Sequence, residues 1–367
     1  MSAAQSLATI DDHLDDVLFW LVSVASPIGE EKVLCDALQE RLAKLPLAGP
    51  IRRTRDSIVV PLVKKGGRPH VALCGHTDTV RTENGPARRE PGRIFGAGVS
   101  DMKSGLAVMV VLAERALARL DVDVTLVFYA REEGPYAENE LGPVLEGDPE
   151  LRSVDLAVCL EPSDNRMQLG CNGSIHATVT FAGKTGHSSR PWEGESAISK
   201  AVPFLAELAA LAPIESHIDG LVYRTVTTVT SAKDGGRGRN VVPDAFVLNV
   251  NHRFAPEFSP EEGQAQVLAL VQRRAQVEWL DVSPAAIPNA KHPLVQKLVA
   301  CGVRTVEPKQ AWTDVARFSA LGVPAINFGP GENAQAHQKN ESCATHLVHQ
   351  GYRLFESWLC VTVEEAK

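Results

Sequence analysis

The sequence predicts an α/β protein in which a mostly parallel sheet is interrupted by a smaller inserted α+β domain. Short apolar runs alternate with helical patterns in the first and last parts of the chain, as in open sheets covered by helices. Between residues 173 and 283 the order changes to β-α-β-β-α-β, which is typical of a ferredoxin-like layer of helices on an antiparallel sheet. We therefore expect one domain formed by residues 1–172 and 284–367, with residues 173–283 inserted in it.

The first domain is predicted to begin with two helices. Leu14, Leu18 and Leu21 recur at helical spacing, and a second helical pattern follows Ser26-Pro27. A further helix is expected at residues 104–119. Five apolar runs have the length and composition of strands buried on both faces, as in parallel sheets. These runs are residues 58–62, 71–74, 124–129, 156–160 and 325–328.

The inserted domain is predicted from a change in the spacing of apolar residues along the chain. Apolar and polar residues alternate in its strands, and its two helices carry apolar residues at helical spacing. Both junctions lie in segments with glycine or proline, where domain insertions are usually tolerated. The expected strands are residues 174–181, 222–229, 246–254 and 276–280, and the expected helices are residues 196–211 and 260–272.

The composition of the chain argues against several classes of protein. A net charge of -8 over 367 residues argues against a nucleic-acid surface as the main binding site. The acidic amino terminus does not resemble a signal peptide, and we find no run long enough to span a membrane. Seven cysteines without a C-x-x-C pair fit a reducing compartment better than a disulfide framework. We therefore expect a cytoplasmic protein that binds neither nucleic acid nor membrane.

His76 and Asp78 follow the apolar run at residues 71–74. If the strand-like alternation continues, both side chains point the same way, so Asp78 can hold the imidazole. A carboxylate on the second ring nitrogen is the usual partner of a metal-binding histidine. The alternative is a turn histidine beside a capping aspartate.

Asp101 ends a glycine-rich turn and opens the predicted helix at residues 104–119. Taken alone, it is best explained as a helix N-cap. A carboxylate also has two oxygens, which lets it bridge two metal ions roughly 3.5 to 4 Å apart. The Gly-x-Gly in this turn lacks the third glycine of a dinucleotide-binding motif, which disfavours a dinucleotide-binding oxidoreductase.

Three more segments contain carboxylates or an imidazole at the end of a predicted strand or in a loop. Glu132 and Glu133 are adjacent, so one can bind metal while the other acts as a general base. Glu161 follows the run at residues 156–160, and His337 lies in a polar loop. Each alone has a simpler explanation as a solvated surface residue. Together, two imidazoles and several carboxylates indicate a zinc-like divalent metal and a metal-dependent hydrolase.

Several short motifs lie in order along most of the chain: His76-Thr77-Asp78, Gly98, Asp101-Met102-Lys103, Gly105, Glu132-Glu133, Glu161-Pro162, Gly186-His187 and Ala336-His337. This ordered set resembles the family of di-zinc exopeptidases and amide deacylases. The resemblance implies two divalent metal ions, most simply zinc, although cobalt or manganese accept the same ligands. It also implies an inserted lid domain that commonly pairs two subunits into a homodimer.

Carried over position by position, the resemblance assigns roles to residues of this chain. His76, Asp101 and Glu161 would bind one metal ion, and Asp101, Glu133 and His337 the other. Glu132 would be the general base and Asp78 would orient His76. His187 and Asn240 would reach a neighbouring active site and stabilise the oxyanion.

The substrate is suggested by a finer resemblance. Segments at residues 189–192, 240–244, 251–256 and 312–318 resemble succinyl-diaminopimelate desuccinylases of the actinobacterial type, whereas Arg131 and residues 138–142 depart from their usual pattern. Such an anionic N-acyl amino acid requires guanidinium groups, and Arg190 and Arg253 are the candidates. The open alternatives are an acetylornithine deacetylase, another N-acyl-amino-acid hydrolase, a carboxypeptidase, or a non-catalytic binding protein.

Overall fold

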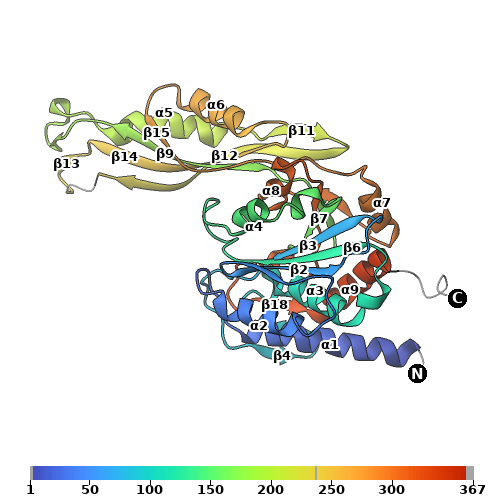
Figure 1. Ribbon diagram of the computed structural model, residues 1–367. Coiled ribbons are helices and arrows are strands. Elements are labelled where there is room, and N and C mark those ends of the chain that lie inside the picture. Colours follow the sequence, from blue (N-terminus) through green and yellow to red (C-terminus); the bar gives the residue numbers. More distant parts are fainter. Residues whose placement is uncertain (1–2, 236–237, 361–367) are drawn as a thin grey trace. The chain divides into compact units, whose positions relative to one another are not determined.

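The computed structural model describes residues 3–235 and 238–360, and its contacts divide the chain into two units. The first comprises residues up to Gly170 together with Pro288–Glu307 and the segment from Arg317 onward. The second comprises Cys171–Ile287 and Pro308–Ala316. Each unit has its own sheet, so each is described separately (Figure 1).

The first unit is built on an eight-stranded sheet. Its three central pairings, β6 with β3, β3 with β7 and β7 with β17, are parallel. A smaller three-stranded sheet of β18 (Ser342–Ala344), β5 (Arg93–Phe95) and β4 (Arg88–Glu90) lies in the same unit. The order in the large sheet is β1 (Arg52–Thr54), β2 (Ser57–Val63), β6 (Asp123–Tyr129), β3 (His70–His76), β7 (Leu156–Cys159), β17 (Ala325–Asn327), β8 (Met167–Leu169) and β16 (Val306–Pro308).

Helices cover both faces of this sheet. In Figure 1, α2 (Lys32–Leu42), α3 (Ser104–Arg115) and α9 (Thr345–Leu359) lie on one face, and α4 (Leu141–Gly147) lies on the other. Helix α3 is buried over most of its length because it packs against β3, α9 and α1 (Ala3–Ser23). The remaining helices are α7 (Pro293–Ala300), which packs on α9, and the short α8 (Val315–Ala320).

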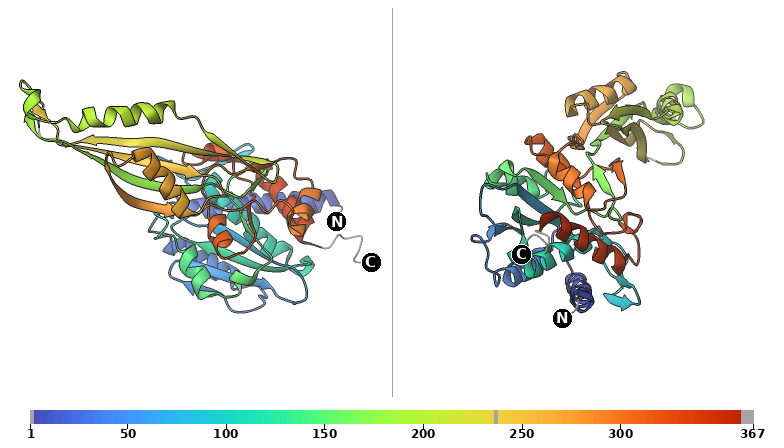
Figure 2. Two further views of the ribbon diagram at one scale, coloured as in Figure 1. Left: turned by 90° about the horizontal axis from the view of Figure 1, so that it is seen from above. Right: turned by 90° about the vertical axis from the view of Figure 1, so that its right-hand side faces the viewer.

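The second unit has a five-stranded antiparallel sheet with both of its helices on one face (Figure 2). Helix α6 (Pro260–Val271) begins at a capping box formed by Ser259 and Glu262. Ser196 caps the start of α5 (Ala197–Ala210) in the same way, by accepting from the Ser199 amide. The strand order is β11 (Ile214–Ile218), β12 (Leu221–Asp234), β14 (Ala245–Phe254), β9 (Gly173–Ala182) and β15 (Gln276–Ser283).

The predicted fold class is confirmed, with two differences in detail. Strand β2 is buried along its whole length, as expected, but it runs antiparallel to β6. The expected domain bounds put residues 308–316 in the first domain, whereas their contacts group them with the second unit. Gln310 donates to the Val222 carbonyl at 2.9 Å and Trp312 donates to the Pro284 carbonyl at 3.0 Å, which explains the grouping.

Over the residues that the structure describes, no helix combines the length and the apolar character needed to cross a membrane.

Candidate metal centre

Three neighbouring strands of the first unit end beside the predicted site. Strand β3 ends at His76, β6 ends three residues before Glu132, and β7 ends two residues before Glu161. These strands are adjacent and parallel, so their carboxyl ends lie at the same edge of the sheet. That edge is where open α/β sheets bind ligands.

Asp101 lies between two imidazoles. His76 Nε2 is 3.2 Å from Asp101 Oδ1, and His337 Nε2 is 3.5 Å from Asp101 Oδ2. His337 Nε2 is also 2.8 Å from Glu133 Oε1. One donor atom from each of His76, Asp101 and Glu133 lies within 4.8 Å of the other two. Imidazole nitrogen and carboxylate oxygen are donors that zinc accepts, so this set fits a divalent cation.

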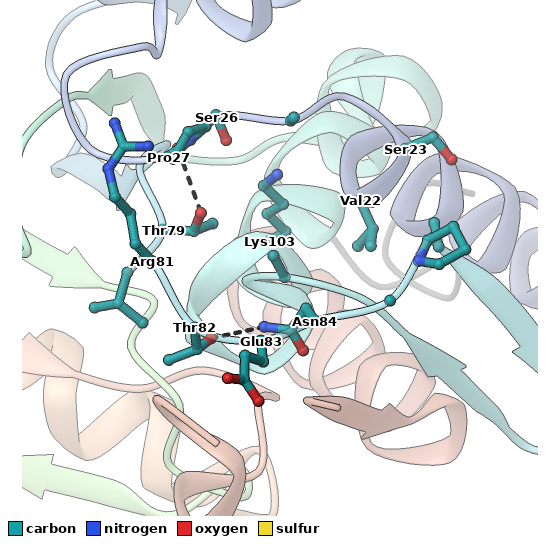
Figure 3. Close-up of a pocket in the computed structure, with 16 residues that line it drawn as sticks. Val22, Ser23, Ser26, Pro27, Thr79, Arg81, Thr82, Glu83, Asn84 and Lys103 are labelled. Atoms are coloured by element: carbon teal, nitrogen blue, oxygen red, sulfur yellow. Dashed lines mark hydrogen bonds between the residues drawn. The ribbon is translucent and has the colours of Figure 1, made fainter. Parts of the chain in front are cut away.

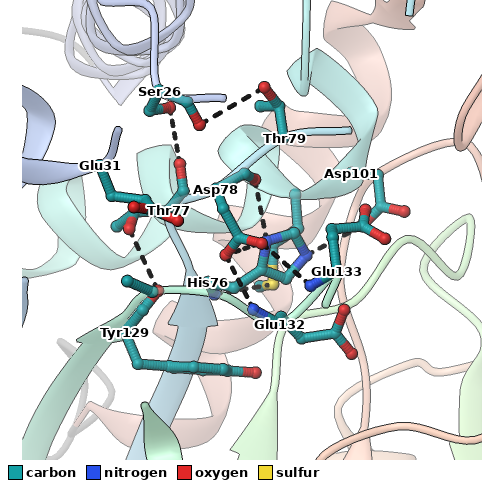
Figure 4. A network of polar contacts seen from close by, with 12 residues as sticks. Ser26, Glu31, His76, Thr77, Asp78, Thr79, Asp101, Tyr129, Glu132 and Glu133 are labelled. Atoms are coloured by element: carbon teal, nitrogen blue, oxygen red, sulfur yellow. Dashed lines mark hydrogen bonds and ion pairs between the residues drawn. The ribbon is translucent and has the colours of Figure 1, made fainter. Parts of the chain in front are cut away.

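Asp78 connects the strand that carries His76 to the two glutamates. Its Oδ1 accepts from the Glu132 amide at 3.0 Å, and its Oδ2 accepts from the Glu133 amide at 2.9 Å. Oδ1 also lies 3.5 Å from His76 Nδ1, and Asp78 is only 1% exposed. Figure 4 shows this carboxylate between the imidazole and the backbone of both glutamates. Asp78 therefore fixes a metal-ligand candidate and the predicted base together.

Charges within the cluster favour a cation. Burial opposes protonation of His76, but its hydrogen bonds with Asp101 and Asp78 raise its pKa well above the usual value. Hydrogen bonds with Asp101 and Glu133 raise the pKa of His337 to about 10. The carboxylates thus attract positive charge at both imidazoles. A divalent ion would supply that charge in place of the two protons.

Glu161 and Glu132 lie at the same edge of the sheet. Glu161 is 5% exposed, and its negative charge contributes to the raised pKa of His76. Glu132 is partly exposed, and Figure 4 shows its side chain extending away from the Asp78 carboxylate that holds its amide. The first unit therefore brings together six of the predicted residues. They are His76, Asp78, Asp101, Glu132, Glu133 and His337, with Glu161 close enough to act on His76 electrostatically.

The remaining predicted residues lie in the second unit. His187 and Asn240 are brought together because β10 (Gly186–His187) pairs with β13 (Val241–Val242), and the Ser188 amide donates to the Asn240 carbonyl at 2.9 Å. Arg190 is exposed and 3.7 Å from Glu193. Arg253 is half-buried on β14, where its Nε donates to Asn251 Oδ1 at 3.0 Å.

One residue that contacts the site, Glu341, is not among those predicted from the sequence. Glu341 is 2% exposed and accepts from the Asp101 backbone amide at 3.0 Å. It lies in the polar loop that contains His337, and a glutamate in such a loop is expected to be solvent-exposed. The only sequence signal is its position immediately before the buried strand β18.

A pocket of about 740 Å³ lies beside the metal-ligand cluster (Figure 3). Residues 79–87 form one side of it, and Lys103 contributes from the loop that carries Asp101. Lys103 donates to the Val24 carbonyl at 2.9 Å, and burial lowers its pKa to about 7. No metal-ligand candidate lines this pocket, so its size does not identify it as the reactive site.

The sequence matches the profile of peptidase family M20/M25/M40 over residues 72–360. A succinyl-diaminopimelate desuccinylase of Corynebacterium glutamicum is 35% identical over 347 residues, which cover 92% of this chain and 94% of that protein. Another, of Leptothrix cholodnii, is 30% identical over 326 residues, which cover 80% and 83% of the two chains.

Solved structures show the same fold. A tripeptidase of Staphylococcus aureus superposes with a TM-score of 0.78 at 18% identity, over 95% of this chain and 97% of that chain. A dinuclear metal-binding peptidase of family M20 from Bacillus subtilis superposes with a TM-score of 0.70 at 13% identity, over 96% and 98% of the two chains.

Proposed function

Since the chain belongs to peptidase family M20/M25/M40 and is a metal-dependent amide hydrolase, we propose that it cleaves N-succinyl-diaminopimelate to succinate and diaminopimelate. One observation supports metal-dependent hydrolysis. Asp101 lies between His76 and His337, with Glu133 beside His337, so one carboxylate is shared by two groups of ligands. The substrate is supported by the 35% identity to the desuccinylase of C. glutamicum.

The ligand assignment comes from the family resemblance, and the shared position of Asp101 supports it. His76, Asp101 and Glu161 would hold one zinc ion, and Asp101, Glu133 and His337 would hold the other. When bound, the two ions supply a Lewis acid that polarises the amide carbonyl and makes the attacking water more acidic. Cobalt would satisfy the same nitrogen and oxygen donors.

Glu132 would move the proton. It takes the proton from the attacking water and later gives it to the departing amine, which is general acid-base work. The Asp78 carboxylate fixes the Glu132 backbone at 3.0 Å while the side chain stays partly exposed. This arrangement holds the backbone of the proposed base in position beside the metal-ligand candidates.

Residues of the second unit would recognise the substrate. Arg253 is suited to a substrate carboxylate because its guanidinium group is half-buried, and a carboxylate would offset the burial that lowers its pKa. A guanidinium group can bind a carboxylate with two hydrogen bonds, and Arg190 would provide a second such group. His187 and Asn240 would stabilise the oxyanion of the tetrahedral intermediate.

The inserted domain, which we place at residues 173–283, would act as a lid and pair two copies of the chain. Helix α5 exposes Ile198 by 38% and Val202 by 55%, which is consistent with an apolar face that a second copy covers. His187 would then serve the active site of the partner. A cytoplasmic location is supported by the cysteines, since all seven are thiols.

A substrate panel tests the proposal. Zinc-loaded protein would be assayed for amine release from N-succinyl-diaminopimelate, N-acetylornithine, a benzoylated amino acid and a dipeptide. We expect turnover of the succinyl compound, with kcat/KM at least 100-fold above that of the other three, because only this substrate has carboxylates for both arginines.

The outcomes separate the alternatives. Preferred turnover of N-acetylornithine or the benzoylated amino acid would replace the substrate and keep the site, and preference for the dipeptide would indicate a peptidase. No turnover of any compound by protein that retains bound zinc would favour a binding protein.

A further inference from the structure

The backbone that carries Asp101 lies in a short π-helical segment, η1 (Val99–Lys103), that is interrupted at Asp101. Gly98, which precedes this segment, has φ of 72°, and Asp101 has φ of -115° and ψ of 93°, so neither residue has helical backbone angles. Backbone amides in such a turn need other acceptors, because an unpaired buried amide is costly. The acceptor used here lies on another loop, more than 200 residues away in sequence.

Three amides of this turn converge on the carboxylate of Glu341. The Ser100 and Asp101 amides donate to Oε1 at 2.8 and 3.0 Å, and the Gly98 amide donates to Oε2 at 2.8 Å. Both carboxylate oxygens are therefore used. The turn is thus bound to Glu341 through three of its backbone amides.

Glu341 is itself fixed in place. Its amide donates to Asn84 Oδ1 at 2.8 Å, and its carbonyl accepts from the Gly96 amide at 3.0 Å. The next residue, Ser342, pairs with Phe95 in the small sheet, and its carbonyl accepts from the Ser100 hydroxyl at 3.0 Å. A buried carboxylate immediately before a paired strand makes a rigid anchor for the turn.

We propose that Glu341 is a positioning residue for the metal centre, which sets the direction of the Asp101 carboxylate between His76 and His337. The inference rests on the proposed function, because it assumes that Asp101 is shared by two ions. A shared carboxylate must present one oxygen to each ion, so a small rotation of its backbone weakens both contacts. Outer partners of metal ligands typically contribute about 10 to 100-fold to metal affinity or activity.

The Glu341→Gln variant tests the proposal. Glutamine keeps the shape but turns one acceptor into a donor that faces an N–H of the turn, so at least one anchor is lost. We expect the zinc affinity of metal-free protein, measured by competition with a chromophoric chelator, to fall about 10 to 100-fold. Excess zinc should restore most of kcat, and KM for the substrate should change little.

Asp123→Asn is a matched control. Asp123 is 4% exposed, and its carboxylate accepts from the Lys65 and Gly66 amides at 2.8 and 2.9 Å. It makes the same kind of contact but begins β6, at the end of the strand opposite the site. Its variant should lose thermal stability while keeping the zinc affinity of the wild type.

The results distinguish failure of the positioning role of Glu341 from failure of the proposed function. Wild-type protein that does not bind two zinc equivalents would contradict the proposed function. Two equivalents in the wild type and unchanged zinc affinity in Glu341→Gln would overturn the positioning role alone. If Glu341→Gln does not fold, Glu341→Asp is measured instead. Its shorter side chain cannot reach all three amides, and the same loss of affinity is expected.

Discussion

At the scale of residues, the candidate site depends on carboxylates that bind backbone rather than metal. Asp78 holds the amides of Glu132 and Glu133 while facing His76. Glu341 does the same for the turn that carries Asp101. The ligand candidates His76, Glu133 and Asp101 are thereby held in position by the protein itself. Such preorganisation reduces the entropy that metal binding must overcome.

Replacement of the proposed base separates chemistry from metal binding. We expect Glu132→Gln to bind zinc as the wild type does and to lose about 100 to 10,000-fold in kcat, the usual contribution of general acid-base catalysis. Zinc content and steady-state rates would be measured together. Glu138→Gln is the control, since Glu138 is in the same loop, 57% exposed and paired with Arg131. A wild-type rate in Glu132→Gln would remove Glu132 from the role of base.

Functional residues can be predicted from the sequence where a local pattern marks them, but not where their role depends on contacts with residues far away along the chain. His76 and Asp78 are predicted because strand periodicity alone places them on one side. The role of Glu341 depends on a hydrogen bond to a residue 240 positions earlier in the chain. No local pattern encodes that contact, so only the folded arrangement identifies it.

At the scale of elements, one glutamate joins the three helices beside the sheet. Glu114 on α3 accepts from Arg41 of α2 at 2.7 Å on Oε1 and at 3.0 Å on Oε2, and Nε2 of His13 on α1 lies 2.7 Å from the same Oε2. The Glu114 side chain is 18% exposed. Burial raises its pKa, but the hydrogen bonds from Arg41 and His13 outweigh this and lower it. The charged form is therefore the one that the folded protein stabilises.

We predict that Glu114→Gln lowers the free energy of unfolding by about 1.5 to 3 kcal/mol at pH 7, the usual value for hydrogen bonds to a charged group. Because the folded pKa is lowered, the contribution is present above the ordinary pKa of 4.5 and is lost as pH falls through the folded value. Urea unfolding at pH 7 and pH 4 would measure it. Equal midpoints for wild type and variant at pH 7 would contradict the prediction, as would a deficit that grows with acidity.

Element types are predicted from sequence better than their pairing. The runs that become β2, β3, β6, β7 and β17 are recognised from buried, apolar composition. A strand buried on both faces has the same composition whichever way its neighbour runs, so the antiparallel pairing of β2 is not visible in it. The contacts of residues 308–316 depend likewise on tertiary partners and have no local signature.

At the scale of the whole molecule, the predicted residues divide between the two units. The metal-ligand candidates and the proposed base lie in the first unit, whereas the residues proposed for oxyanion and substrate binding lie in the second. In the proposed reaction, His187 acts on the active site of a partner chain. Catalysis would then require assembly of two copies.

Light scattering tests this requirement. We predict a particle of twice the 39.6 kDa chain mass at micromolar concentration. Val202→Glu, which places a charge on the exposed face of α5, should shift the mass toward the monomer and lower kcat. A monomer mass that is independent of concentration, in protein with full activity, would remove the partner-subunit role of His187.

The initial rate of succinate release from N-succinyl-diaminopimelate, measured as zinc is added to metal-free protein, tests most directly whether this chain is a two-metal desuccinylase. We predict no turnover without metal and a rate that rises until two equivalents per chain are bound, because Asp101 is shared by two ligand groups. Full activity of the metal-free protein, or no succinate release with two equivalents bound, would contradict the claim.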